Sequence, residues 1–390
     1  MNLILGFGVI LLLGLAATRV TYKIKIPAIT DYLLLGIIIG PSVLHIIPEN
    51  VIGISGIISN VVLGLIAFTI GQNFSKANFE RIGRQVLWIS ILETLGAWLF
   101  VTLTFILLLR MPLYLAILFG AISSATAPTA TLMVIREYHS KGIFTDTLLG
   151  VVAIDDAWCL IVFAVSLAIS KAIYVPTNNP HLLRVVFGAL IHIFGAFLLG
   201  GVIAFLLYRL SGFLRNQAEI LTYTIGFLFL NTGLAIYFNL SVLLANMFLG
   251  AVLVNINQAN FKFFDTVKTV DFPLFLVFFV IAGANLEISL LGKLGIIGSS
   301  YVIVRITGKV IGARIGGYIS GAEGKIKKYL GWGLVPQAGV ALGTALAAKA
   351  EFPKVGGTIL TTIVATTVIY EIFGPLCTKY ALKKAGEIGG

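Results

Sequence analysis

Residues 145–170 form a mostly apolar segment, and about 20 such residues are enough for a helix to cross a lipid bilayer. Two adjacent carboxylates, Asp155 and Asp156, lie near its middle. Placing one acidic residue at the bilayer centre costs about 2.5–3.5 kcal/mol, so such a residue is expected to have a partner and a function. The segment therefore predicts a membrane-spanning helix that carries a charged site.

The chain as a whole is also apolar, with 58% hydrophobic and 11% charged residues. This leaves too little polar surface to cover a soluble fold, so we predict an all-α integral membrane protein surrounded by lipid. The net charge of +11 does not indicate a nucleic-acid partner, because the basic residues lie in loops. The two cysteines lie in apolar segments and the four histidines are scattered, which indicates neither a disulfide framework nor a soft-metal site.

Hydropathy and helix-breaking residues predict about thirteen transmembrane helices. The N-terminal segment lacks a basic start and a small-residue cleavage site, so we read it as a retained span. The predicted spans are residues 2–20, 29–46, 55–74, 86–109, 112–136, 145–171, 182–208, 217–236, 238–255, 269–287, 291–320, 328–349 and 355–378.

Lys and Arg residues are concentrated in alternate loops, which predicts the orientation of the chain. Cytoplasmic loops of membrane proteins are enriched in these residues. We therefore expect the N-terminus outside and the C-terminus in the cytoplasm. The basic stretches are residues 19–25, 76–84, 136–141, 209–215, 262–268, 325–328 and 379–384.

Two of the predicted spans are interrupted by Pro, Gly and small polar residues, at residues 122–132 and 333–343. They occupy equivalent places if the first six and last six spans form inverted repeats joined by the seventh. Paired broken helices in such repeats mark the midplane site of many transporters. The sequence thus predicts inverted six-helix repeats with crossed broken helices.

Few charged residues remain inside the apolar segments. Lys309 is the natural partner for Asp155, because a buried ammonium can release its proton and the pair can be made and broken. Arg305 is a second candidate charge partner, and a static pair with Glu93 or Glu371 is equally expected for it. The candidates for structural ion pairs are Glu93, Glu371 and Arg314.

Crossed breaks beside Asp156 would form a pocket rich in oxygen ligands. Carboxylate, hydroxyl and carbonyl oxygens suit Na⁺ or Li⁺. If Asp156 holds either a proton or Na⁺, the protein exchanges the two ions, with no enzymatic reaction, nucleotide or other cofactor. The expected pocket residues are Ser123, Ser124, Thr126, Pro128, Thr129, Pro336, Gln337 and Gly339.

Five motifs along the chain resemble those of the CPA2 branch of cation:proton antiporters, especially NapA-like sodium/proton antiporters with the NhaA fold. They are LLLGIIIGPSVL (33–44), SSATAPTATLMVIREYHSKG (123–142), VVAIDDAW (151–158), FFVIAGANLEI (278–288) and GKVIGARIGG (308–317). The resemblance implies that Asp155 pairs with Lys309 and that Asp156 carries the ion. It also implies electrogenic exchange in a prokaryotic inner membrane.

The same resemblance implies a homodimer in which a core domain moves like an elevator against a dimerisation domain. Residues 86–171 and 291–390 would form the core, with a short cytoplasmic tail. Residues 1–85 and 172–290 would form the dimerisation domain and the connecting helix.

One departure from the family pattern concerns ion selectivity. Many members carry a P-R-G-E-like stretch where this chain has Pro336, Gln337, Ala338 and Gly339. A K⁺/H⁺ antiporter on the same scaffold is therefore the first alternative, and a cation-gated sensor or leak protein is the second. An intramembrane aspartic protease is disfavoured, because its two carboxylates must converge from separate helices.

Overall fold

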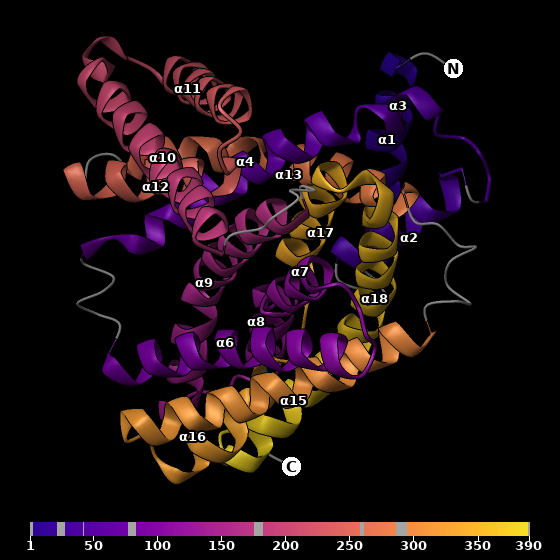
Figure 1. Cartoon of the computed structure of the whole chain (residues 1–390), viewed down its shortest axis with the longest axis vertical. Coiled ribbons are helices and arrows are strands. Elements are labelled where there is room, and N and C mark those ends of the chain that lie inside the picture. The colour runs from indigo at the N-terminus through magenta and orange to yellow at the C-terminus, as the bar shows by residue number, and fades with distance from the viewer. Residues whose placement is uncertain are drawn as a thin grey trace. The chain divides into compact units, whose positions relative to one another are not determined.

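A computed structural model describes residues 3–21, 28–41, 43–76, 83–174, 182–257, 261–285 and 295–388. These residues form helices joined by turns, with no strand among them (Figure 1). Within the described ranges, eight helices are long and apolar enough to cross a membrane, or up to nine if a bent pair counts as one span. The prediction of an all-α membrane protein is confirmed, whereas the number of thirteen spans stays a prediction.

The described residues pack into two compact units. Unit 1 comprises Met1–Gly56, Ile82–Cys159 and Leu276–Gly390, and unit 2 comprises Ile57–Arg81 and Leu160–Phe275. Two long helices, α9 (Ile143–Tyr174) and α13 (Phe261–Ala284), have residues in both units. This division follows packing and does not identify parts that move, so the predicted core and dimerisation domains stay predictions.

Unit 1 contains both interrupted spans and all the charged residues proposed for the site. Its other helices are α1 (Leu3–Thr21), α2 (Ala28–Ile39), α3 (Glu49–Gly53), α6 (Arg84–Leu107), α7 (Leu113–Ser123), α8 (Pro128–Glu137), α15 (Gly295–Ser320), α16 (Gly324–Tyr329), the 3₁₀ helix η5 (Leu330–Leu334), α17 (Gly339–Glu351) and α18 (Pro353–Ala385).

Unit 2 has an apolar core in which Phe68 and Phe264 stack with their ring centroids 4.4 Å apart. Its helices, besides the parts of α9 and α13, are α4 (Ser55–Gly71, continuing from unit 1), η2 (Gln72–Phe74), α10 (Leu182–Arg209), η3 (Ser211–Phe213), α11 (Gln217–Tyr237) and α12 (Val242–Ile256).

Several helix ends differ from the predicted ones for local reasons. The segment predicted to begin at residue 238 begins at Val242, because Asn239 is in the left-handed region (φ 54°) and the Ser241 side chain caps α12. The last helix runs to Ala385 rather than ending at residue 378. Gly386, in the left-handed region with φ 81°, ends it. Residues 286–294, which include the predicted start of the span at residue 291, lie outside the described residues.

Both predicted interruptions are present. The first span is divided into α7 and α8, separated by residues 124–127, and Pro128 occupies the first turn of α8. The second is divided between η5 and α17, and its two halves are bent by 52°. Proline lacks the N–H that a continuous helix requires, and this contributes to the break at each place.

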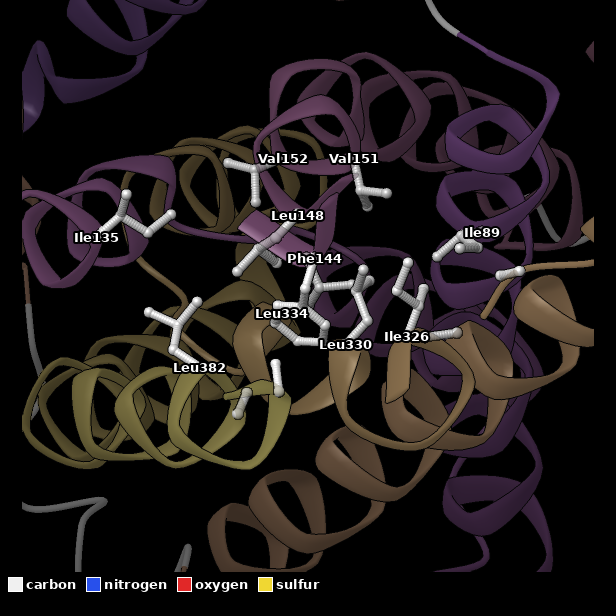
Figure 2. Packing of buried hydrophobic residues seen from close by; sticks show 14 of the residues in the cluster. Ile89, Ile135, Phe144, Leu148, Val151, Val152, Ile326, Leu330, Leu334 and Leu382 are labelled. Atoms are coloured by element: carbon white, nitrogen blue, oxygen red, sulfur yellow. The ribbon is translucent and has the colours of Figure 1, made fainter. Parts of the chain in front are cut away.

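The half of α9 that precedes the two aspartates is fixed by an apolar cluster in unit 1. Figure 2 shows Phe144 and Leu148 of α9 close to Leu330 and Leu334 of η5. All four side chains are at most 3% exposed. The helix that carries the carboxylates is therefore packed against the segment leading into the second break.

Candidate functional site

The two aspartates of α9 have different surroundings, as adjacent residues about 100° apart on a helix require. Asp155 is fully buried, and its Oδ1 accepts a hydrogen bond of 3.1 Å from the Thr94 hydroxyl of α6. Asp156 is only partly buried, but its Oδ1 is enclosed and has no hydrogen-bond partner among the described residues. Asp155 Oδ2 is likewise enclosed without a donor, so the two residues differ in that Thr94 holds Asp155 whereas no described side chain donates to Asp156 Oδ1.

Lys309 of α15 is fully buried between carboxylates from two helices. Its Nζ lies 2.5 Å from Glu93 Oε2 and 3.6 Å from Asp155 Oδ2. It also donates a hydrogen bond of 2.8 Å to the Thr126 hydroxyl in the first break. Lys309 therefore lies within ion-pair distance of Asp155, but its shorter contact is with Glu93.

Glycines explain why Glu93 and Lys309 can meet. Helices α6 and α15 run side by side in unit 1 (Figure 1). A Cβ atom at Gly308 would lie 2.7 Å from the carbonyl oxygen of Gly96, and one at Gly312 would lie 2.8 Å from the Cα of Glu93. Small residues four positions apart let membrane helices approach closely. The same face of α15 then presents the ammonium of Lys309 to α6.

The two breaks are joined by hydrogen bonds. The backbone N–H of Ala127 donates to the carbonyl of Pro336 across 2.9 Å, and the Gln337 amide donates to the carbonyl of Ile122 across 2.9 Å. The Thr131 hydroxyl of α8 donates to Gly333 in η5 across 3.1 Å. These bonds satisfy backbone groups that the breaks free from helical pairing, as a membrane interior requires.

Arg305 occupies a different place from the predicted one. Its guanidinium donates to the carbonyls of Ser123 (2.8 Å) and Ala125 (2.6 Å) in the first break and to Val335 (2.7 Å) in the second. It also lies over the Tyr370 ring, 4.4 Å from the centroid. A cation here stabilises the negative ends of both half-helices.

The expectation that Arg305 pairs with a carboxylate is therefore wrong. Among the described residues it forms no ion pair, and its nitrogens bond to backbone carbonyls instead. The breaks supply these acceptors at closer range than any acidic side chain. Glu93, one of its two predicted partners, pairs with Lys309.

Two other predicted ion-pair residues lie apart from this cluster. Arg314 is exposed near the end of α15, 6.0 Å from the Tyr318 ring centroid, and forms no ion pair among the described residues. Its long side chain can reach the membrane surface, which removes the need for a buried partner. Glu371 is buried in α18, and its predicted ion pair stays a prediction.

The hydroxyls of Ser123, Ser124 and Thr126, which were predicted to line the pocket, are buried and already form hydrogen bonds within the protein. Ser123 and Ser124 each donate a hydrogen bond of 2.6 Å to carbonyls of α7, and Thr126 accepts from Lys309. Thr129 lies in the first turn of α8, and its side chain lies outside the described part. No three His, Cys, Asp or Glu side chains converge as a metal cluster within the described ranges. A cation at Asp156 would need backbone, hydroxyl or water oxygens to complete its ligands.

Sequence reasoning missed Thr94 and the shorter Lys309–Glu93 pair. Thr94 carries no charge and follows Glu93 directly in α6, so no spacing set it apart. The stripe of Gly308, Gly312 and Gly316 was the available signal, because it indicates a close helix partner. It does not say which helix that partner is.

Comparisons with known proteins show the family to which the chain belongs. The family model described as "Sodium/hydrogen exchanger, transmembrane" matches residues 8–384. The chain is 23% identical over 385 residues to a Na(+)/H(+) antiporter of Enterococcus hirae, covering 97% of this chain and 98% of that one. It is 26% identical over 282 residues to the ammonium/H(+) antiporter subunit AmhT of Alkalihalophilus pseudofirmus, covering 70% of this chain and 68% of that one.

The fold is also that of solved structures. The sodium proton antiporter MjNhaP1 of Methanocaldococcus jannaschii at pH 8 superposes with a TM-score of 0.78 at 22% identity, covering 100% of this chain and 99% of that one. An electron-microscopy map of the same antiporter gives a TM-score of 0.71 at 21% identity, with full coverage of both chains. Helices, broken spans, buried charges and a match along nearly the whole sequence lead to one conclusion: the chain is an integral membrane cation/proton antiporter and belongs to the sodium/hydrogen exchanger family.

Proposed function

We propose that this protein exchanges Na⁺ or Li⁺ for H⁺ and that the two ions compete for Asp156. The observation that supports this assignment is the enclosed Oδ1 of Asp156, which no described donor contacts. A buried carboxylate without partners is unstable unless a proton or a cation neutralises it. Asp155, by contrast, is held by Thr94 and lies near Lys309.

The exchange is electrogenic and proceeds by elevator-type alternating access in a homodimer. This part of the proposal rests on the resemblance of the Asp155–Asp156 pair and Lys309 to the CPA2 branch. The moving core comprises residues 86–171 and 291–390, with residues 1–85 and 172–290 as the dimerising part. The N-terminus faces outward and the C-terminus faces the cytoplasm of a prokaryotic cell.

A second candidate cargo is a larger monovalent cation, K⁺ or NH₄⁺. The observation in its favour is the similarity to AmhT, which is named for ammonium. In the second break this chain also has Gln337 where many CPA2 members carry an Arg, and its amide bonds to Ile122 and lies near Tyr301. The scaffold and the role of Asp156 are the same in both cases.

The test uses the purified protein in proteoliposomes with an imposed pH gradient, read with a pH-sensitive dye. Na⁺, Li⁺, K⁺ and NH₄⁺ are added separately, and a voltage-sensitive dye reports charge movement. Collapse of the pH gradient by Na⁺ or Li⁺ with a membrane potential supports the first candidate. Collapse by K⁺ or NH₄⁺ alone supports the second candidate instead. No response to any cation contradicts both candidates and favours a cation-gated sensor.

A further inference from the structure

We propose that Glu93 is a positioning residue for transport: it neutralises Lys309 and thereby leaves the charge of Asp155 available to the cation at Asp156. The inference rests on the proposed function, because it concerns the same site. It departs from the pairing of Asp155 with Lys309 that the family resemblance implies. The geometry around the ammonium is the first reason for it.

An ammonium has three N–H donors. Lys309 directs one to Glu93 Oε2 at 2.5 Å and another to the Thr126 hydroxyl at 2.8 Å. Asp155 Oδ2 is 3.6 Å away, beyond hydrogen-bond distance, and has no hydrogen-bond partner among the described residues. Glu93 is therefore the main counter-ion of Lys309.

The burial of these groups makes the choice of partner matter. Glu93, Asp155 and Lys309 are each 0% exposed, and Asp156 is partly buried with its Oδ1 enclosed. When all are ionised, three carboxylates face one ammonium. If Glu93 takes the ammonium, the two uncompensated charges belong to neighbouring residues of α9. Both then attract a cation electrostatically to this part of α9.

Thr94 links the two carboxylates that compete for Lys309. Its hydroxyl lies 3.1 Å from Asp155 Oδ1 and 3.4 Å from Glu93 Oε1. The shorter distance marks Asp155 as its acceptor. Asp155 is thus oriented by a neutral hydroxyl rather than by the ammonium, which leaves its negative charge uncancelled.

The test compares Glu93→Gln with the double variant Glu93→Gln/Lys309→Gln in proteoliposomes, using the cation that the wild type transports. In Glu93→Gln the ammonium loses its nearer partner and turns to Asp155. We expect KM for the cation to rise about tenfold, which corresponds to about 1.4 kcal/mol. When Lys309 is removed as well, no ammonium neutralises the negative charge of Asp155. KM for the cation should therefore return toward the wild-type value.

The control is Asp265→Asn, which removes an exposed pair with Lys268 and should leave KM and kcat unchanged. A lower kcat with unchanged KM in Glu93→Gln, or a double variant that keeps the raised KM, overturns the inference. If Glu93→Gln does not fold, Glu93→Asp takes its place: the shorter side chain withdraws from Lys309, and an unchanged KM there also overturns it. Failure of the proposed function is seen separately, as a wild type that transports no Na⁺ or Li⁺.

Discussion

The backbone N–H of Ala127 donates a hydrogen bond to the carbonyl of Pro336, 2.9 Å away and in the other broken span. Neither residue has a helical partner for that group, because each lies in an interruption. In lipid an unpaired backbone group costs several kcal/mol. The two breaks therefore stabilise each other and behave as one structural element.

Arg305 should be essential to this element. Arg305→Met leaves the carbonyls of Ser123, Ala125 and Val335 without a donor, and each such loss costs about 1–3 kcal/mol. We expect thermal unfolding in detergent to show a loss of at least about 3 kcal/mol. Arg314→Met, on the exposed end of the same helix, serves as the control and should change stability little. Equal losses in the two variants would show that the carbonyl network contributes nothing.

Gly312 should tolerate no side chain. Alanine normally favours a helix over glycine by about 0.5–1 kcal/mol. At Gly312, however, a Cβ atom would overlap the carbonyl of Leu92 and the Cα of Glu93. Gly312→Ala should therefore lower the unfolding temperature and weaken transport, by forcing α15 away from α6.

Gly298 provides the matched control on the same helix. A Cβ atom there meets only the methyl group of Thr366, at 3.7 Å. Gly298→Ala should leave stability unchanged or raise it slightly. If both alanine variants behave alike, close approach at Gly312 does not position Lys309.

Glu387 should stabilise the start of the helix that carries the aspartates. Its carboxylate accepts hydrogen bonds from the backbone N–H groups of Phe144 and Thr145, both 2.8 Å, and from the Thr145 hydroxyl, 2.6 Å. A negative group at a helix N-terminus also interacts favourably with the helix dipole. Glu387→Gln should cost about 1–2 kcal/mol, comparable to the loss of a strong helix cap.

Hydrogen exchange is the measurement for this variant, with faster exchange expected at residues 144–147. Glu323→Gln is the control, because Glu323 precedes α16 without forming a side-chain cap. Unchanged exchange in the Glu387 variant would mean that the carboxylate contributes little to the start of α9.

Competition at Asp156 predicts the direction of the pH dependence. A cation binds only the ionised carboxylate, so protons raise its apparent KM. In the range where the carboxyl is mostly protonated, KM for Na⁺ should rise about tenfold for each unit by which the pH falls. Transport measured at several pH values over a range of Na⁺ concentrations provides the slope. A KM independent of pH would mean that the two ions bind at separate places.

The interrupted spans could be predicted because their cause is local. Pro128 and Pro336 each lie among Gly, Ala and small polar residues, which weaken a helix together with the missing N–H of proline. A proline alone is not enough, since Pro273 and Pro375 lie inside continuous helices. The resulting prediction of two breaks is confirmed by α7 and α8 and by η5 and α17. Hydropathy likewise predicted helices, since long apolar segments leave few other structures in a membrane.

The partners of the buried cations could not be predicted in the same way. Spacing places Arg305 and Lys309 on one face of a helix, but it does not determine the axial register of α15 relative to α6. That register depends on the close contacts of Gly308 and Gly312 with α6, which is far away in the sequence. The acceptors of Arg305 exist only because both breaks meet, so no list of acidic residues contained them.

The role of Asp156 is tested most directly by proton movement in proteoliposomes for the wild type and Asp156→Asn, with the same imposed pH gradient and the same added cation. We expect the cation to collapse the gradient in the wild type. We expect no collapse in Asp156→Asn, although the variant folds with an unchanged elution profile. Normal exchange by folded Asp156→Asn would contradict the central claim that this carboxylate carries the transported ion.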